Sequence, residues 1–158
     1  MLIDMSAQEH VMGLDPGFRN VGVVIAAYPD MSIIYENTYT AAPSNTHTHY
    51  LSYLADLFAR FNPSAVAIEK PFFTTKTLSR NVGTLEFIGI LKLLCEKHSL
   101  ELYQYSPTAI KKAATGSGVA DKAKMVSAAK ELFNCSFSSH HSADAACIAK
   151  TYLDTRLK

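Results

Sequence analysis

The sequence predicts one α/β domain, with a five-stranded mixed sheet flanked by helices. A chain of 158 residues suits a single hydrophobic core. Three short apolar runs follow one another near the N-terminus with turn residues between them, which is typical of an antiparallel meander. Two later apolar runs each follow a segment of helical periodicity, which favours two parallel strands. We expect residues 1–158 to form one domain, with residues 1–9 as a short flexible extension.

The strands of the meander are predicted over residues 11–15, 21–28 and 33–39. Pro16-Gly17 begins the first turn and Pro29-Asp30 forms the second, because these residues favour the backbone conformations of tight turns. Apolar side chains between residues 49 and 61 then recur at helical spacing, and Asn62-Pro63 ends that helix.

The rest of the chain alternates strands and helices. The remaining strands are predicted at 65–69 and 100–105, and the remaining helices at 78–98, 106–114, 121–133 and 142–157. The helix at 78–98 is apolar around more than one face, so one face can pack on the sheet while another meets a partner. Ser106-Pro107 is typical of a helix start, and residues 115–120 form a glycine-containing loop.

Composition excludes several classes of protein. Hydrophobic residues make up 48% and charged residues 18% of the chain, which argues against disorder. No apolar run approaches the roughly 20 residues that span a bilayer, so we expect no membrane partner. Three cysteines without a C-x-x-C pair indicate neither a disulfide framework nor a zinc cluster, and a cytoplasmic location is expected.

The net charge of +1 conceals an asymmetry along the chain. Residues 1–69 hold two basic groups against seven acids, and residues 70–158 hold thirteen basic groups against seven acids. This distribution is compatible with an acidic metal site beside a basic surface for a polyanion, although a solvated lysine-rich face would look the same.

Two acids end otherwise apolar strands. Asp15 precedes Pro16, and Glu69 ends the strand at 65–69. An ionised carboxylate at such a place loses hydration unless it is paired or binds a cation. If the two strands are neighbours, the carboxylates converge, and a divalent cation would satisfy both. Read alone, Asp15 could instead be a turn residue.

Asp144 and His141 are three residues apart near the start of the last helix, which places them on one helical face. Oxygen ligands with at most one imidazole suit Mg²⁺ or Mn²⁺ better than zinc. Two such ions about 3.5–4 Å apart support phosphodiester hydrolysis. The alternatives are a favourable helix-terminal charge for Asp144 and an ordinary exposed histidine for His141.

Three segments carry a resemblance to a known family. They are Gly13-Leu14-Asp15-Pro16-Gly17 with Asn20 and Gly22 following, Ala67-Ile68-Glu69, and Ser142-Ala143-Asp144-Ala145-Ala146 with Ile148-Ala149. In this order and approximate spacing they resemble the acidic motifs of the RuvC family of Holliday-junction resolvases. The resemblance spans about residues 11–152 and implies a ribonuclease H-like fold.

The resemblance also implies a mechanism. Asp15, Glu69 and Asp144 would be metal ligands for two Mg²⁺ or Mn²⁺ ions, with His141 in the place of a fourth acidic or imidazole ligand. Lys111 and Lys122 fall where the family carries functional lysines, and a lysine near the scissile phosphate stabilises developing negative charge. The implied activity is structure-selective cleavage of Holliday junctions and related branched DNA by paired symmetric nicks.

Further residues are predicted to bind DNA, and the resemblance implies a homodimer. Phe72 matches the aromatic residue that the family places at the junction centre, and aromatic rings can stack on unpaired bases. The complete predicted DNA-binding set is Phe72, Phe73, Lys76, Arg80, Lys111, Lys112, Lys122 and Lys124. The dimer would form through the helix at about 78–98 and present two sites to symmetry-related strands.

Other functions remain open from the sequence. A ribonuclease H-like nuclease of the YqgF type, linked to RNA processing, and a general branch or flap nuclease are the nearest alternatives. A phosphate-binding ATPase or sugar kinase shares an Asp-x-Gly turn but needs two such domains to enclose a nucleotide. A catalytically silent nucleic-acid-binding module would not need the full set of acids.

Overall fold

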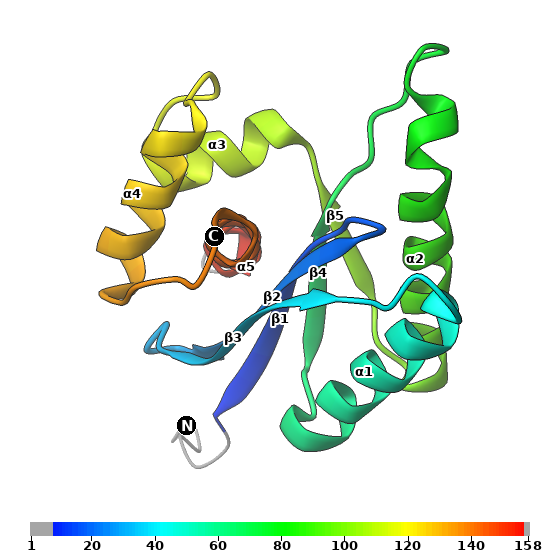
Figure 1. The fold of residues 1–158 in the computed structure, drawn as a ribbon. Coiled ribbons are helices and arrows are strands. Elements are labelled where there is room, and N and C mark those ends of the chain that lie inside the picture. Colours follow the sequence, from blue (N-terminus) through cyan, green and yellow to red (C-terminus); the bar gives the residue numbers. More distant parts are fainter. Residues whose placement is uncertain (1–7, 157–158) are drawn as a thin grey trace.

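The computed structural model describes residues 8–156, and a five-stranded mixed sheet forms their centre (Figure 1). The strand order is β3-β2-β1-β4-β5. The strands are β1 (Glu9–Asp15), β2 (Asn20–Tyr28), β3 (Ile33–Thr40), β4 (Ala65–Glu69) and β5 (Leu102–Tyr105). Strand β2 pairs antiparallel with both β1 and β3, and β4 pairs parallel with both β1 and β5. The predicted α/β class, with a meander and two parallel strands, is therefore confirmed.

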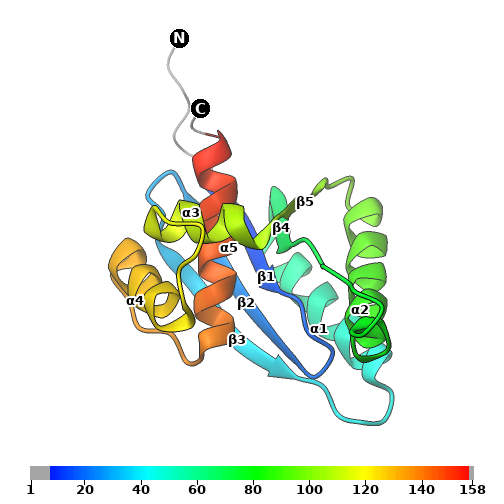
Figure 2. The same cartoon turned by 90° about the horizontal axis from the view of Figure 1, so that it is seen from above.

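Helices cover both faces of the sheet (Figures 1 and 2). The helices are α1 (Thr46–Phe61), α2 (Leu78–Lys97), α3 (Pro107–Thr115), α4 (Lys122–Phe133) and α5 (His140–Arg156). Helices α1 and α2 pack on one face, where Leu14 and Ile68 lie in their core. The other three pack on the opposite face, and α5 lies directly against β1 and β2. No helix within the described range 8–156 is long and apolar enough to cross a membrane.

Two element boundaries differ from the prediction for local reasons. Strand β5 begins at Leu102 rather than at residue 100, because the N–H of Leu100 donates to the carbonyl of Cys95 and so belongs to the end of α2. Helix α1 begins at Thr46 rather than at residue 49, because the N–H of His49 donates to the carbonyl of Asn45 and closes a helical turn before that residue.

The predicted bounds of the last helix and of the N-terminal extension lie partly outside the described residues. Helix α5 begins at His140, two residues before the predicted start, so His141 lies inside the helix. Residue 157, the predicted last residue of that helix, lies outside the described residues. Residues 1–7 of the predicted N-terminal extension also lie outside them, whereas Glu9 already belongs to β1.

Candidate active site

Asp15 and Glu69 occupy neighbouring places at the carboxyl ends of β1 and β4. The strands run parallel with Leu14 opposite Ile68, so the next residue of each strand is an acid. Because side chains alternate between the faces of a strand, the two acids face α5 while Leu14 and Ile68 face α1 and α2. Asp15 therefore lies at the end of the central strand, where two parallel strands bring two carboxylates together.

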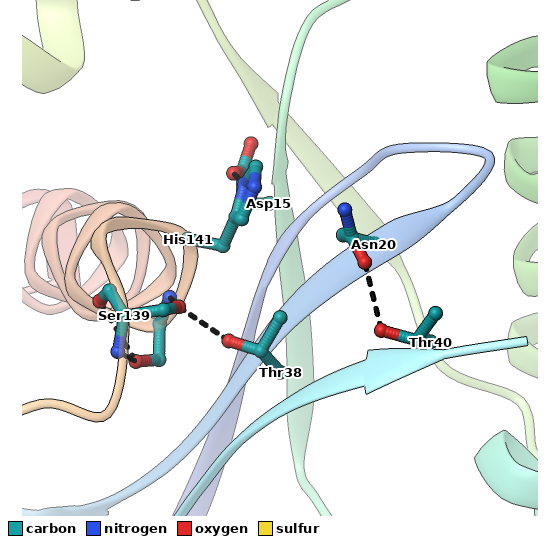
Figure 3. A network of polar contacts seen from close by, with 7 residues as sticks. Asp15, Asn20, Thr38, Thr40, Ser139 and His141 are labelled. Carbon is teal, nitrogen blue, oxygen red and sulfur yellow. Dashed lines mark hydrogen bonds and ion pairs between the residues drawn. The ribbon is translucent and has the colours of Figure 1, made fainter.

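The start of α5 is held at this edge of the sheet by a polar network (Figure 3). The N–H of Ser142 donates to Ser139 Oγ at 3.2 Å, and the N–H of Ser139 donates to Ser142 Oγ at 3.3 Å. This reciprocal cap satisfies N–H groups at the helix start that have no partner within the helix. Ser139 Oγ also hydrogen-bonds to Thr38 Oγ1 of β3. The cap and the bond to β3 together set the position of the first turn of α5, which carries His141.

Small residues allow α5 to approach the sheet closely. A Cβ atom at Gly13 would overlap the carbonyl oxygen of Ala145, and one at Gly22 would overlap the carbonyl of His141. The helix contributes mainly alanines to this contact, namely Ala143, Ala145, Ala146 and Ala149, all of them buried. Backbone thus packs almost on backbone, which places the side chains of the first turns of α5 beside the end of β1.

Asp15 and His141 are in direct contact. The imidazole Nδ1 lies 2.9 Å from Asp15 Oδ2, and the side chains are 21% exposed for Asp15 and 29% exposed for His141. An ionised carboxylate can only accept a hydrogen bond, so Nδ1 is the protonated nitrogen when Asp15 is charged. Such pairing fixes the ring orientation and leaves Nε2 available as an acceptor or ligand.

Burial raises the pKa values of all three carboxyl groups, and repulsion from neighbouring carboxylates adds to this for Glu69 and Asp144. For Asp15 the main cause is burial, opposed by the hydrogen bond from His141. Burial followed by the charge of Asp15 raises the pKa of Asp144 to about 6. Glu69 reaches about 6 for the same reasons, with a further contribution from Asp144 and an opposing one from Lys111. Each ionised carboxylate therefore costs free energy here, and a cation among them would relieve that cost.

The donor set fits a hard divalent cation, although it does not form a closed cage. Within residues 8–156, no three acidic, histidine or cysteine side chains converge tightly enough to surround an ion as they stand. Neither Glu69 nor Asp144 forms an ion pair with another described residue, so their charges are not neutralised in that way. Carboxylate oxygens of this kind are the ligands that Mg²⁺ and Mn²⁺ prefer.

All six predicted catalytic residues line one cleft of about 570 Å³. They come from five separate elements and are Asp15, Glu69, Lys111, Lys122, His141 and Asp144. Lys111 belongs to α3 and Lys122 opens α4, so two ammonium groups border the acidic cluster. The sequence prediction overlooked two polar residues of the cleft, Asn20 and Asp121. Asn20 could have been found from the sequence because it belongs to the first motif, whereas nothing in the local sequence indicated that Asp121 belongs to the site.

A smaller cavity of about 140 Å³ adjoins the acids on the side of α2. Asp15 and Glu69 line it together with Phe72 and Phe73. Phe72 is 79% exposed, whereas Phe73 is partly buried. Asn81 and Thr84 of α2 also line this cavity and were missed by the sequence prediction, because a polar residue in an amphipathic helix normally indicates only an exposed face.

The structure separates the other predicted DNA-binding residues from the cleft. Lys112 lines a different cavity, with Tyr105 and Asp154, and Lys124 lines a groove between α3 and α4 that also contains Glu131. Lys76 and Arg80 are exposed just before and within the first turn of α2, and line neither acidic cavity. Their predicted contacts with DNA remain predictions.

Comparison with known proteins supports one family. The model of the family "Crossover junction endodeoxyribonuclease RuvC" matches residues 11–152. The RuvC protein of Alkaliphilus metalliredigens is 32% identical over 131 residues, which cover 78% of this chain and 79% of that protein. The RuvC protein of a Wolbachia strain from Brugia malayi is 29% identical over 154 residues, which cover 92% of this chain and 94% of that protein.

Solved structures share the fold. The structure of Thermus thermophilus RuvC superposes with a TM-score of 0.79 at 22% identity, covering 94% of this chain and 96% of that one. The same protein in complex with a Holliday junction substrate gives a TM-score of 0.80 at the same identity and coverage. With the family match over residues 11–152 and the relatives in agreement, the chain belongs to the RuvC family of crossover junction endodeoxyribonucleases.

Proposed function

We propose that this protein resolves Holliday junctions and related branched DNA by metal-dependent phosphodiester hydrolysis, cutting two symmetry-related strands as a homodimer. The observation that carries the proposal is the cleft in which Asp15, Glu69 and Asp144 meet two lysines. Acidic oxygens suit divalent cations, and neighbouring ammonium groups suit a phosphate. We further propose that it acts in the cytoplasm of a bacterial cell or of one infected by phage.

Each of the six predicted catalytic residues has a proposed part. Asp15, Glu69 and Asp144, with Nε2 of His141, would hold Mg²⁺ or Mn²⁺, in all two ions. When bound, such ions supply a nucleophilic water and stabilise the leaving oxygen. Lys111 and Lys122 bind the non-bridging oxygens of the scissile phosphate and stabilise the charge that develops on them.

Residues outside the cleft would adapt the site to branched DNA. The exposed ring of Phe72 adjoins the acids and is free to stack on a base that has left its pair at the junction centre. Stacking of this kind favours junctions over plain duplex, because a duplex offers no unpaired base without an unpairing cost.

The proposed dimer forms through α2. Its exposed apolar residues, Leu78, Val82, Leu85 and Leu93, are 39–50% exposed and recur at spacings of four, three and eight residues. These positions fall on one stripe of the helix, which is the pattern of a helix that packs against a second helix. A two-fold pairing through this stripe would give each of the two symmetry-related strands of the junction its own cleft.

The test is cleavage of a synthetic four-way junction by the purified protein with Mg²⁺ or Mn²⁺. We expect paired nicks at symmetric positions in opposing strands, with 5′-phosphate and 3′-hydroxyl ends that ligase can rejoin. Asp144→Asn should lower the cleavage rate by about 100-fold or more while the junction remains bound. Asp56→Asn, an exposed carboxylate of α1, is the matched control and should cut normally.

Other outcomes would assign the protein elsewhere. Unpaired nicks on flaps and forks at equal rates would indicate a general branch nuclease, and cleavage of structured RNA in preference to junction DNA would indicate an RNA-processing enzyme. Binding without cleavage under any divalent cation would indicate a silent binding module. Normal cutting by Asp15→Asn, Glu69→Gln and Asp144→Asn alike would overturn the assignment of the site.

A further inference from the structure

A second groove leads away from the active-site cleft along α4. It has a volume of about 530 Å³ and is lined by Lys122, Ala123, Val126, Ser127, Lys130 and His140. Lys122 lines both this groove and the cleft that holds the acids, so the two cavities are adjacent. His140, which also lines the groove, is the first residue of α5 and directly precedes His141 of the cleft.

The lining of the groove suits a phosphate chain. No acidic residue lines it, whereas two ammonium groups, a hydroxyl and an imidazole do. The nearby acid Glu131 lines a neighbouring groove together with Lys124, and Ser127 borders both grooves. The groove that continues the cleft thus has cations without acids, whereas the neighbouring groove has a mixed pair.

The spacing of the lysines also suits DNA. Lys122 and Lys130 are eight residues apart on α4, which corresponds to about 12 Å along a helix axis at 1.5 Å per residue. That distance is about the rise of three or four base pairs of duplex DNA. A strand whose scissile phosphate contacts Lys122 could therefore place a second phosphate, a few nucleotides away, at Lys130.

We propose that this groove binds the phosphate backbone of the duplex arm that leaves the cut site, with Lys130 and Ser127 as its outer contacts. The proposal rests on the proposed function, because it requires branched DNA in the cleft. The groove would set the direction in which the arm leaves the active site, and it would add affinity that does not depend on base sequence.

Lys130 also has a purely structural explanation, and the test must distinguish it from DNA binding. It lies in the last turn of α4, where a cation stabilises the helix through the helix dipole. Loss of that effect would lower the melting temperature but would leave DNA affinity and its dependence on salt unchanged.

The experiment measures binding of the full chain to a four-way junction at several salt concentrations, in Ca²⁺ so that cleavage is slow. Lys130→Gln is compared with Arg60→Gln, which removes one positive charge from the exposed surface of α1 on the opposite face of the sheet. We expect Lys130→Gln to weaken binding roughly 3- to 10-fold and to reduce the slope of log K against log salt by about 1, as for the loss of one phosphate contact. Arg60→Gln should leave both quantities at the wild-type values.

The outcomes distinguish this proposal from the proposed function. If the wild type binds and cuts junctions but Lys130→Gln has the wild-type affinity and slope, only the groove assignment is overturned. If Lys130→Gln lowers only the melting temperature, Lys130 serves helix stability, and the groove assignment is overturned in this case too. If the wild type binds no branched DNA, both proposals fall together.

Discussion

Gly22 of β2 lies directly beneath the backbone carbonyl of His141 in α5, so closely that a Cβ atom at position 22 would overlap it. The contact joins two segments separated by more than a hundred residues of sequence. It determines how near the first turn of α5 lies to the sheet, and hence where His141 and Asp144 stand relative to Asp15.

Gly22→Ala should therefore damage the site without removing any chemical group from it. The methyl group forces the start of α5 outward, which we expect to lower the free energy of unfolding by about 1–3 kcal/mol, as for other overpacked interiors. Displacement of His141 and Asp144 by even part of an ångström should reduce the cleavage rate by about 10- to 100-fold. Chemical denaturation and single-turnover cleavage measure the two effects. A fully active, fully stable Gly22→Ala protein would show that the close packing does not position the site.

Glu69→Gln should stabilise the metal-free protein in a pH-dependent way. The pKa of Glu69 is raised from its ordinary value of 4.5 to about 6 in the folded state, so the folded protein binds this proton more tightly than the unfolded chain. The resulting stability is fully present below about pH 4.5 and is lost as the pH rises through about 6. Removal of the charge should thus add at most about 2 kcal/mol at pH 8 and almost nothing at pH 4.

Thermal unfolding of wild type and Glu69→Gln in EDTA, at pH 4 and pH 8, measures this difference. Addition of Mg²⁺ or Mn²⁺ at pH 8 should make the wild type the more stable of the two proteins, because only the wild type retains the full set of charged ligands. Metal affinity of the wild type should fall below about pH 6, where Glu69 and Asp144 hold protons that the cation must displace. An affinity independent of pH between 5 and 8 would contradict this account.

The adjacent lysines of α3 should behave differently. Lys111 lines the acidic cleft, whereas Lys112 lines a separate cavity with Tyr105 and Asp154. Lys111→Ala should lower the cleavage rate at saturating DNA by about 100-fold, because a cation beside the developing phosphate charge is lost. Lys112→Ala should change DNA affinity alone. Equal effects of both substitutions on the saturated rate would indicate a general loss of positive charge rather than a specific role of Lys111.

The apolar stripe of α2 should control the oligomeric state. Leu93 is 49% exposed on this stripe, and Leu51 of α1 is a comparable leucine at 40% exposure outside it. Leu93→Asp places a charge in the proposed helix pair and should convert a dimer into a monomer in analytical ultracentrifugation. Leu51→Asp should sediment as the wild type does. A wild-type protein that is monomeric at micromolar concentration would remove the dimer from the proposal.

Loss of the dimer should also change the pattern of cleavage. A monomer retains the acids of a single cleft, so Leu93→Asp should still nick one strand of the junction. The two nicks should then occur independently, and nicked intermediates should accumulate. Paired cutting at the wild-type rate by a monomeric variant would show that symmetry of the two cuts does not come from α2.

Much of the fold could be predicted because its elements depend on local pattern. Short apolar runs separated by turn residues identified the meander, and periodicity identified the helix at α2 within a residue of its end. The errors lay where distant or capping contacts decide the boundary. Leu100 looked like part of a strand but completes the end of α2, and the cap formed by Ser139 and Ser142 moved the start of α5 to His140.

The chemical groups of the site could be identified from the amino-acid residues alone, because acids that end apolar strands at Asp15 and Glu69 need a partner whatever the fold. Gly13 and Gly22 have no Cβ atom, so the backbone of another element can approach them closely. Three further points depend on how the whole chain packs. Packing brings α5 against these glycines and sets Asn20 and Asn81 at the acidic cavities. It also places Lys111 and Lys122 beside the acids and Lys112 and Lys124 away from them. The physical reason is that a residue's type follows from local sequence, whereas the direction of its side chain depends on how separately formed elements pack together.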